Sequence, residues 1–235
     1  MVKEMKKIGL LIFASVLALT GCTKYSATEG LLEQLQGEHP EVSISYLYDG
    51  VIAFTPTHPQ AGMVFYQGCY VDYVSYAPLM AALAERGYLC LLVRTPGDMA
   101  LMGTTYAHRL RRQYGELARF YVGGHSLGGV AAATSLASHL DDFDGLVLLG
   151  SYSSADLSGS GKRVVSVYGS LDSVMQRDKY EANLAHLPAD YRELVIEGGN
   201  HSGFGSYGHQ EGDGEATITP EEQIRQTVEF IADNL

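Results

Sequence analysis

Positive charge is scarce in this sequence of 235 residues, because 16 lysines and arginines stand against 27 aspartates and glutamates, giving a formal charge of −11. A nucleic-acid partner is therefore not expected, since phosphates are bound by a basic face. The same deficit disfavours a polybasic attachment to anionic lipid. Runs of five like charges and repeats of fixed period are also missing from the sequence, which argues against charged interaction tails and a repeat architecture.

The N-terminal apolar run is too short to cross a membrane. It covers twelve residues, 8–19, whereas a spanning helix needs about 20. Lysines precede it and the letters LTGC follow, at residues 19–22, which is the pattern of an export signal. This ending resembles the lipobox of bacterial lipoproteins. The resemblance implies that Cys22 is acylated, becomes the mature N-terminus and anchors the protein in the cell envelope, outside the cytoplasm. The alternative is a plain secretory signal.

Cysteine is also rare, with Cys69 and Cys90 remaining after Cys22. One disulfide is an alternative, but a domain of this size does not depend on it. Cys90 lies in an apolar run typical of a buried strand, so two free thiols are the preferred interpretation. The sequence has no zinc-ligand spacing, and neither a metal nor a cofactor is expected.

The chain divides into a signal segment (1–21), a polar tether (22–40) and one domain (41–235). Within the domain, Asp49-Gly50 separates two β-rich runs and predicts a hairpin. Short apolar runs then alternate with amphipathic helices, which predicts an α/β fold with a mostly parallel sheet covered by helices on both faces. The expected strands are residues 63–66, 89–93, 120–122, 146–149, 164–167 and 194–196.

The last helix carries its own start signal. Thr219 is the expected N-cap, Pro220 occupies the first helical position and Glu222 completes a capping box. Apolar residues then recur at helical spacing to the end of the chain.

The most informative short motif is FYVGGHSLGGVAAA, residues 120–133, which contains the pattern G-x-S-x-G around Ser126. In a chain with 27 glycines the pattern also arises by chance, so its position must decide. Ser126 follows an expected strand and precedes an expected helix, as a nucleophile elbow requires. Gly124 and Gly128 would leave room for the strained turn. The alternative is a tight strand–helix turn with an ordinary serine.

A nucleophile elbow needs an acid and a base later in the chain, in the order Ser, Asp, His. Asp172 lies five residues after Val167 and His201 lies five residues after Ile196, the last residues of two expected strands. These equal offsets place both side chains beyond the carboxyl ends of strands, where α/β sheets bind ligands. Asp172 is also a suitable N-cap for a following helix, and the two roles are compatible.

The other histidines fit the role of base less well. His125 lies inside the elbow and is expected to pack beside the turn, while His108 and His139 fall in expected helices. His209 is the remaining alternative because it shares a loop with His201.

Acyl chemistry also needs hydrogen-bond donors for a developing oxyanion. The backbone N–H of Leu127, at the positive end of its helix, is one candidate. The backbone N–H of Cys69, in the loop after residues 63–66, is the other, with Gly68 allowing the turn. Gln67 either projects into the site or caps the strand.

Six segments together resemble bacterial α/β-hydrolases of the compact, single-domain kind related to dienelactone hydrolases. They are YQGCYVDYVSYAPL, LAERGYLCLLVRTPGDMAL, GGHSLGGVAAA, GLVLLGSYSS, VYGSLDSV and GGNHSGFGSYGHQEGDGEATITPEEQ. The resemblance extends from about Val51 to the C-terminus. It implies a catalytic triad of Ser126, Asp172 and His201. Relatives usually have Pro-Gly where this chain has Gln67-Gly68.

The region in which many lipases insert a lid is short here, with fourteen residues, 150–163, between two expected strands. We therefore expect no cap domain and an open site suited to small or exposed esters. The sequence predicts a membrane-anchored, exported serine hydrolase of carboxylesterase type. The alternatives are a catalytically idle binding lipoprotein and an acyltransferase. The loop at 202–218 is interpreted as a hydrated surface loop packed near the active site, with a calcium loop at Glu211, Asp213 and Glu215 as the alternative.

Overall fold

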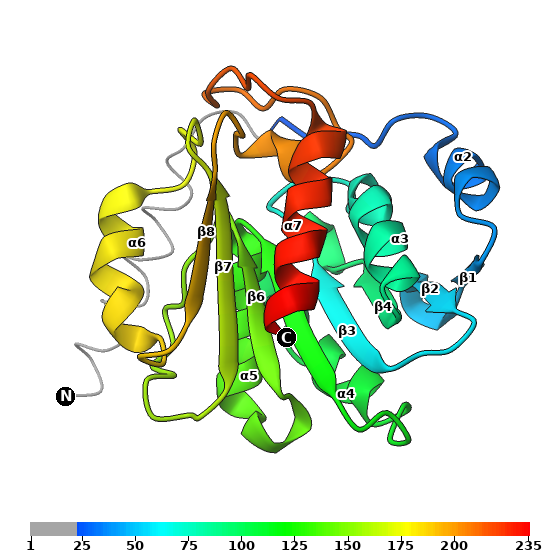
Figure 1. Ribbon diagram of the computed structural model, residues 1–235, viewed down its shortest axis with the longest axis horizontal. Helices are drawn as coiled ribbons and strands as arrows, with labels where there is room; N and C mark the ends of the chain where they lie inside the picture. Colours follow the sequence, from blue (N-terminus) through cyan, green and yellow to red (C-terminus); the bar gives the residue numbers. More distant parts are fainter. Residues whose placement is uncertain (1–22) are drawn as a thin grey trace.

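An eight-stranded sheet forms the centre of the computed structural model, which describes residues 23–235 (Figure 1). Its strand order is β1-β2-β4-β3-β5-β6-β7-β8. The predicted signal segment and Cys22 lie outside the described residues. The strands are β1 (Val42–Tyr46), β2 (Ile52–Pro56), β3 (Ala61–Tyr66), β4 (Tyr88–Val93), β5 (Phe120–His125), β6 (Gly145–Leu149), β7 (Arg163–Gly169) and β8 (Arg192–Ile196).

The sheet is antiparallel at one edge and parallel elsewhere. The pairs β1–β2 and β2–β4 are antiparallel, and the five pairs from β4 to β8 are parallel. The β1–β2 hairpin turns through Asp49 and Gly50, both with positive φ, as the sequence predicts. Because parallel strands align their carboxyl ends, the loops after β3, β5, β6, β7 and β8 meet at one edge.

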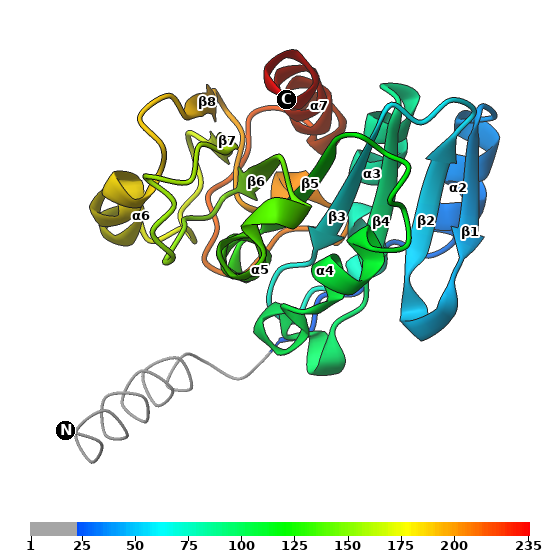
Figure 2. The ribbon, with the colours of Figure 1, turned by 90° about the horizontal axis from the view of Figure 1, so that it is seen from below.

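Helices cover both faces of this sheet (Figure 2), which confirms the predicted fold class. Helices α2, α3 and α7 lie on one face, and α4 and α5 lie on the other with α6 beside them. Their bounds are α2 (Leu31–Glu38), α3 (Ala77–Glu85), α4 (Tyr106–Arg111), α5 (Leu127–Ser138), α6 (Arg177–Asn183) and α7 (Pro220–Asn234). In the described part of the chain, none of these helices is long and apolar enough to cross a membrane.

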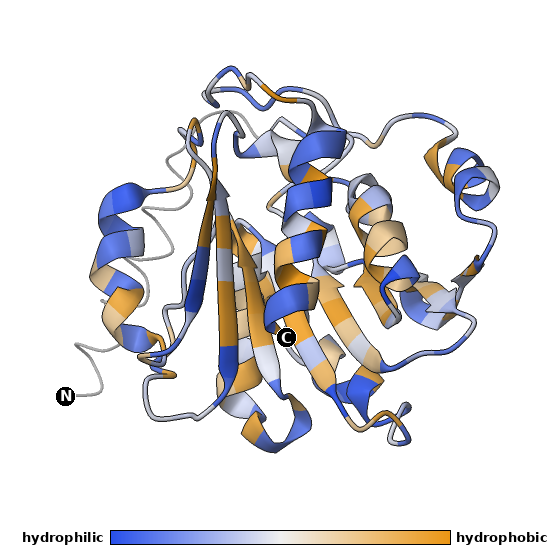
Figure 3. Cartoon of the chain, viewed as in Figure 1, coloured by the Kyte–Doolittle hydropathy of each residue, from blue (hydrophilic) through white to orange (hydrophobic). Residues whose placement is uncertain are grey.

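Each face of the sheet has its own hydrophobic core. In β3, Met63 and Phe65 belong to the core under α3 and α7, whereas Val64 and Tyr66 belong to the core under α5. Successive strand residues point to opposite faces, so a strand buried on both sides must be apolar throughout. Figure 3 shows this contrast between apolar central strands and the polar outer faces of α6 and α7.

The segment predicted to be a tether packs on the domain over residues 23–38. Tyr25 bridges to Val71, and Leu31 and Leu35 of α2 are buried in the core beside α3. The N–H of Thr28 also donates to the carbonyl of Ser206 at 3.0 Å. The two leucines lie four residues apart, on one face of the helix. Most of the other residues of this segment are polar, and the segment was therefore predicted to be a tether.

The start of α7 agrees with the sequence except at one position. The Thr219 side chain accepts a hydrogen bond from the N–H of Glu222 at 3.2 Å, and Pro220 is in the first turn. The Glu222 carboxylate, however, binds Arg225 and Gln226 and does not bond back to Thr219. The expected capping box is therefore half formed, because the nearby guanidinium competes for the carboxylate.

Two further expectations concern the cysteines and the lid region. Neither Cys69 nor Cys90 forms a disulfide within residues 23–235, and burial strongly raises the pKa of the Cys90 thiol. Residues 150–162 form neither helix nor strand, so no cap domain is inserted between β6 and β7.

Candidate active site

Ser126 occupies a strained turn between β5 and α5. Its backbone has φ 53° and ψ −125°, a region that residues with side chains rarely adopt and that costs about 1–3 kcal/mol. Hydrogen bonds hold this conformation in place. The N–H of Ser126 donates to the carbonyl of Leu149 at 2.9 Å, and its own carbonyl accepts from Gly129 N–H (3.0 Å) and Ser151 Oγ (2.6 Å). The end of β6 thus fixes the turn.

Two glycines flank this turn because backbone lies against both of them. A Cβ on Gly124 would lie 2.3 Å from the carbonyl carbon of Gly128, and a Cβ on Gly128 would lie 2.3 Å from the carbonyl oxygen of Tyr66. These separations confirm the steric reason given for the glycines of the motif. They also show that the first turn of α5 packs directly on the end of β3.

His201 and Asp172 form a hydrogen-bonded pair at the carboxyl edge. His201 Nδ1 donates to Asp172 Oδ2 at 2.8 Å, and the two side chains are 1% and 0% exposed. The other Asp172 oxygen accepts from the N–H groups of Val174 (3.0 Å) and Met175 (2.8 Å). Helix α6 begins only at Arg177, so Asp172 closes a turn and is not the N-cap of that helix.

The end of β6 brings the pair and the serine turn together. Ser126 is bonded to Leu149, and the next residue, Gly150, has φ 50°. A Cβ on Gly150 would lie 2.9 Å from His201 Nδ1 and 3.0 Å from Asp172 Oδ2. His201 Nε2 is buried and has no hydrogen-bond partner among residues 23–235. With Nδ1 occupied by Asp172, Nε2 is the nitrogen left for proton exchange. Hydrogen bonds between base and nucleophile are often long before substrate binds.

His125 packs against the ring of His201, a contact that the sequence did not predict. Its ring is fully buried and its centroid lies 4.3 Å from that of His201. Its Nδ1 shares a 2.8 Å hydrogen bond with the Tyr76 hydroxyl, which also accepts from Gly68 N–H at 3.1 Å. Burial first, and the neighbouring His201 second, lower the pKa of His125 well below its usual value. The His125 ring that packs against His201 is therefore neutral.

Asp213 fixes the backbone of the loop that carries His201. Its carboxylate accepts from the N–H groups of His201 (3.1 Å) and Ser202 (2.8 Å) and from the Ser202 hydroxyl (3.0 Å). Asn200, the residue before His201, is held by Gln223 of α7. The Gln223 side-chain amide bonds to both the N–H (3.0 Å) and the carbonyl (2.8 Å) of Asn200. Sequence reasoning placed Asp213 in a surface loop and missed this contact, for which the sequence carries no local signal.

The expected oxyanion donors lie on two segments that touch. Leu127 is the first residue of α5, so its N–H has no acceptor within the helix. Cys69 lies in the loop after β3, and Gly128 packs against the carbonyl oxygen of Gln67 in that same loop. The Gln67 side chain is fully buried, and its amide atoms make no hydrogen bond within the described residues. The alternative in which Gln67 caps the strand therefore has no hydrogen bond to support it.

Comparison with known proteins assigns the family. Residues 62–225, most of the chain, match the model of the Alpha/beta hydrolase family. The chain belongs to the α/β-hydrolase family. No curated protein gives a significant sequence match.

Solved structures of other α/β-hydrolases share the fold at low sequence identity. A CIB-like hydrolase from Thermoplasma acidophilum has a TM-score of 0.60 at 17% identity, covering 82% of this chain and 98% of its own. Dienelactone hydrolase from Anabaena variabilis has a TM-score of 0.59 at 14% identity, covering 83% and 97%. Monoacylglycerol lipase from Paleococcus ferrophilus has a TM-score of 0.61 at 13% identity, covering 82% and 100%. At these identities the likeness concerns the fold.

Proposed function

We propose that this α/β-hydrolase is a serine esterase in which Ser126, His201 and Asp172 act as a catalytic triad. The observation that carries the proposal is the buried His201–Asp172 hydrogen bond beside the strained serine turn. It leaves Nε2 as the one ring nitrogen able to accept a proton. In a neutral imidazole whose Nδ1 donates, Nε2 has the free lone pair, which is the tautomer that a general base requires.

In the proposed reaction, Ser126 Oγ attacks the ester carbonyl carbon while His201 Nε2 takes the hydroxyl proton. The carbonyl oxygen becomes an oxyanion, stabilised by the N–H groups of Leu127 and Cys69. When the C–O bond to the alcohol breaks, Nε2 returns the proton to the departing oxygen. A water molecule then attacks the acyl-enzyme by the same steps, releasing the acid and restoring Ser126. Asp172 keeps the imidazole oriented and stabilises its positive charge.

The short connection between β6 and β7 supports small or exposed esters as the substrate class. Residues 150–162 form no helix or strand, so no cap domain from this region covers the site. A buried acyl-chain tunnel of the kind that a lid closes is therefore not expected. We further propose that Cys22 carries a lipid anchor that holds the enzyme on a bacterial membrane, with the hydrolase domain outside the cytoplasm, a proposal that rests on the residues LTGC in the sequence.

Labelling with a fluorophosphonate probe tests the proposed nucleophile. We expect one adduct, mapped to Ser126 by mass spectrometry, which is lost in Ser126→Ala and in His201→Gln. Ser154→Ala is a matched control, because Ser154 is an exposed serine of the open loop and its loss should leave labelling unchanged. A folded protein that takes no label would favour the idle binding protein instead. Turnover of p-nitrophenyl acetate with and without added alcohols separates hydrolysis from acyl transfer.

Metabolic labelling tests the proposed anchor. In a bacterial host fed an alkyne-bearing palmitate, the full chain should incorporate the label and sediment with membranes. Cys22→Ser should lose both properties. Unlabelled, soluble wild-type protein would show that the signal is a plain secretory one.

A further inference from the structure

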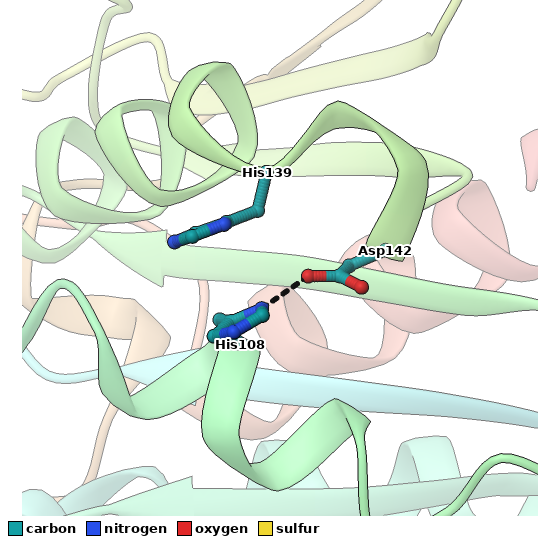
Figure 4. Close-up of side chains that lie close together, drawn as sticks. All are labelled: His108, His139 and Asp142. Carbon is teal, nitrogen blue, oxygen red and sulfur yellow. Dashed lines mark hydrogen bonds and ion pairs between the residues drawn. The ribbon is translucent and has the colours of Figure 1, made fainter.

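Two histidines and an aspartate come together outside the candidate active site. Figure 4 shows His108, His139 and Asp142 with the two imidazole rings stacked and the carboxylate beside His108. One ligand atom from each residue lies within 4.8 Å of the other two. The three belong to different elements: His108 to α4, His139 to the residue after α5, and Asp142 to the short 3₁₀ turn Leu140–Asp142. His139 and Asp142 lie three residues apart in one local turn, and tertiary folding brings His108 to them.

The cluster is accessible from solvent but not loosely exposed. The side chains of His108 and Asp142 are 26% and 25% exposed, and His108 Nδ1 is hydrogen-bonded to an Asp142 oxygen. The ring centroids of His108 and His139 lie 3.9 Å apart, with 11° between the ring planes. An ion from solvent can therefore reach all three groups without opening the core.

The cluster lies far from the proposed chemistry. Ser126 precedes the first residue of α5 and His139 follows its last, and a helix of 12 residues is about 18 Å long. Asp142 precedes β6 by three residues, so it lies at the amino edge of the parallel strands. The carboxyl edge, at which β5 and β8 end, is the opposite one (Figure 1).

We propose that His108, His139 and Asp142 bind a divalent transition-metal ion of the Zn²⁺ type. Two imidazoles and one carboxylate are ligands that Zn²⁺ accepts, at about 2.0–2.2 Å, with water filling an open position. Ligand atoms that share such an ion lie about 3–4 Å apart, so the group needs to contract by about 1 Å. Binding through Nδ1 replaces the His108–Asp142 hydrogen bond, and the neutral ring then carries its one proton on Nε2, the nitrogen that faces away from the metal.

The ring stack must also open when the metal binds. The lone pair of an imidazole nitrogen lies in the ring plane, so two nearly parallel rings cannot both direct one at the same ion. Rotation of the partly buried His139 side chain meets this requirement. The guanidinium of Arg111 is held by the carbonyls of Asp142 (3.0 Å) and Tyr114 (2.7 Å) and lies over the Phe120 ring. It is thus turned toward backbone acceptors and an aromatic face.

The metal would have a structural role and would take no part in catalysis. It would join the six-residue α4 to the connection between α5 and β6. Since a ligand that binds the folded state alone stabilises it, the melting temperature should rise with metal concentration.

The test is Zn²⁺ titration of tag-free protein near neutral pH, by isothermal calorimetry and thermal melting. We expect one ion per chain and a rise in Tm of about 5–10 °C when free Zn²⁺ is 100-fold above its Kd. His139→Phe keeps a stacked ring but removes a ligand, and Asp142→Asn keeps a hydrogen-bond acceptor but removes the charge. Each should weaken binding at least tenfold and abolish most of the Tm shift.

His39→Phe provides the matched control. His39 pairs with Glu85 at 2.7 Å on another part of the surface, so this variant removes a histidine–carboxylate pair that lacks a third ligand. Its Zn²⁺ stoichiometry and Tm shift should equal those of the wild type. Absence of binding, or binding that persists unchanged in His139→Phe and Asp142→Asn, would overturn the proposal. The second result would place the ion elsewhere, for example on Cys69 or His201.

Discussion

The Nδ1 atom of His201 lies 2.8 Å from Oδ2 of Asp172, and neither side chain is reached by solvent. The second Asp172 oxygen is held by two backbone N–H groups, from Val174 and Met175. The carboxylate is therefore fixed from both sides. Because water does not reach this pair, the residue at position 172 decides which nitrogen of the His201 ring carries the proton.

Asp172→Asn should abolish most activity with little change in fold. The asparagine oxygen would remain on the two backbone N–H groups, leaving its NH₂ to face His201 Nδ1. Nδ1 would then have to accept, which moves the ring proton to Nε2 and removes the general base. We expect kcat/KM for p-nitrophenyl acetate to fall by about 10³–10⁴-fold. Near-wild-type activity would exclude Asp172 as the orienting acid.

Gly128→Ala should destabilise the protein, since the added Cβ would lie 2.3 Å from the Tyr66 carbonyl oxygen. Both atoms are held by backbone, so the turn or β3 must shift. Overpacking of this kind costs about 1–3 kcal/mol or more, measurable as a lower urea midpoint together with lost activity. In Gly115→Ala the new Cβ has no atom within 4 Å, and its stability should change far less. Equal effects of the two substitutions would contradict the close-packing argument.

His125 should make stability fall as the solution becomes acidic. Its pKa is lowered in the folded protein, chiefly by burial, from an ordinary value of 6.5. Below about pH 6.5 the unfolded chain therefore binds a proton on this histidine, whereas the folded protein does not. The stabilisation is fully present above that pH and is lost as the pH falls toward the folded pKa.

The expected slope is up to about 1.4 kcal/mol per pH unit for one such proton. Urea unfolding across this range, in the wild type and in His125→Phe, isolates this histidine from the carboxylates that both proteins share. The variant should lose stability less steeply on acidification. Parallel curves would mean that His125 takes up its proton equally in both states.

Asp213→Asn tests the carboxylate that holds the His201 loop. An asparagine supplies one acceptor in place of two, so one of the N–H groups of His201 and Ser202 loses its partner. Since a displacement of about 1 Å at a catalytic group can cost roughly 100-fold, we expect kcat to fall by about 10–100-fold with little change in KM. Glu215→Gln, in the same loop, is a control because that side chain is 92% exposed. A rise in KM alone would indicate a substrate contact.

Added calcium and EDTA extend the Asp213 test. Both carboxylate oxygens already accept backbone or hydroxyl hydrogens, so neither reagent should alter the activity or melting temperature of the wild type. A calcium-dependent Tm would revive the alternative of a calcium loop.

The alternation of apolar runs and amphipathic helices was enough to predict the sheet and its two helical layers, and the short segment 150–163 predicted that a cap domain is missing. The strands that this alternation marked were found at or within a few residues of their expected places. Local sequence suffices here because a strand buried on both faces has to be apolar at every position, as Met63, Val64 and Phe65 are. The positions of Ser126, Asp172 and His201 after strand ends followed from the same pattern, and their catalytic roles remain predictions.

Other features depend on contacts between residues distant in sequence, and only the tertiary structure decided them. Residues 22–40 were predicted to be a tether, but Leu31 and Leu35 of this segment are buried beside α3 as part of a packed helix. Asp213 reaches the backbone of His201 because the long loop after β8 folds back on itself. His125, the last residue of β5, packs against the His201 ring because β5 and β8 end at the same edge of the sheet.

His108, His139 and Asp142 are likewise joined only when α4 packs beside the end of α5. Sequence by itself determined which residues stand at the ends of strands. Folding determined which of those residues touch, because strand order and loop conformation, and not spacing along the chain, set the distances between them.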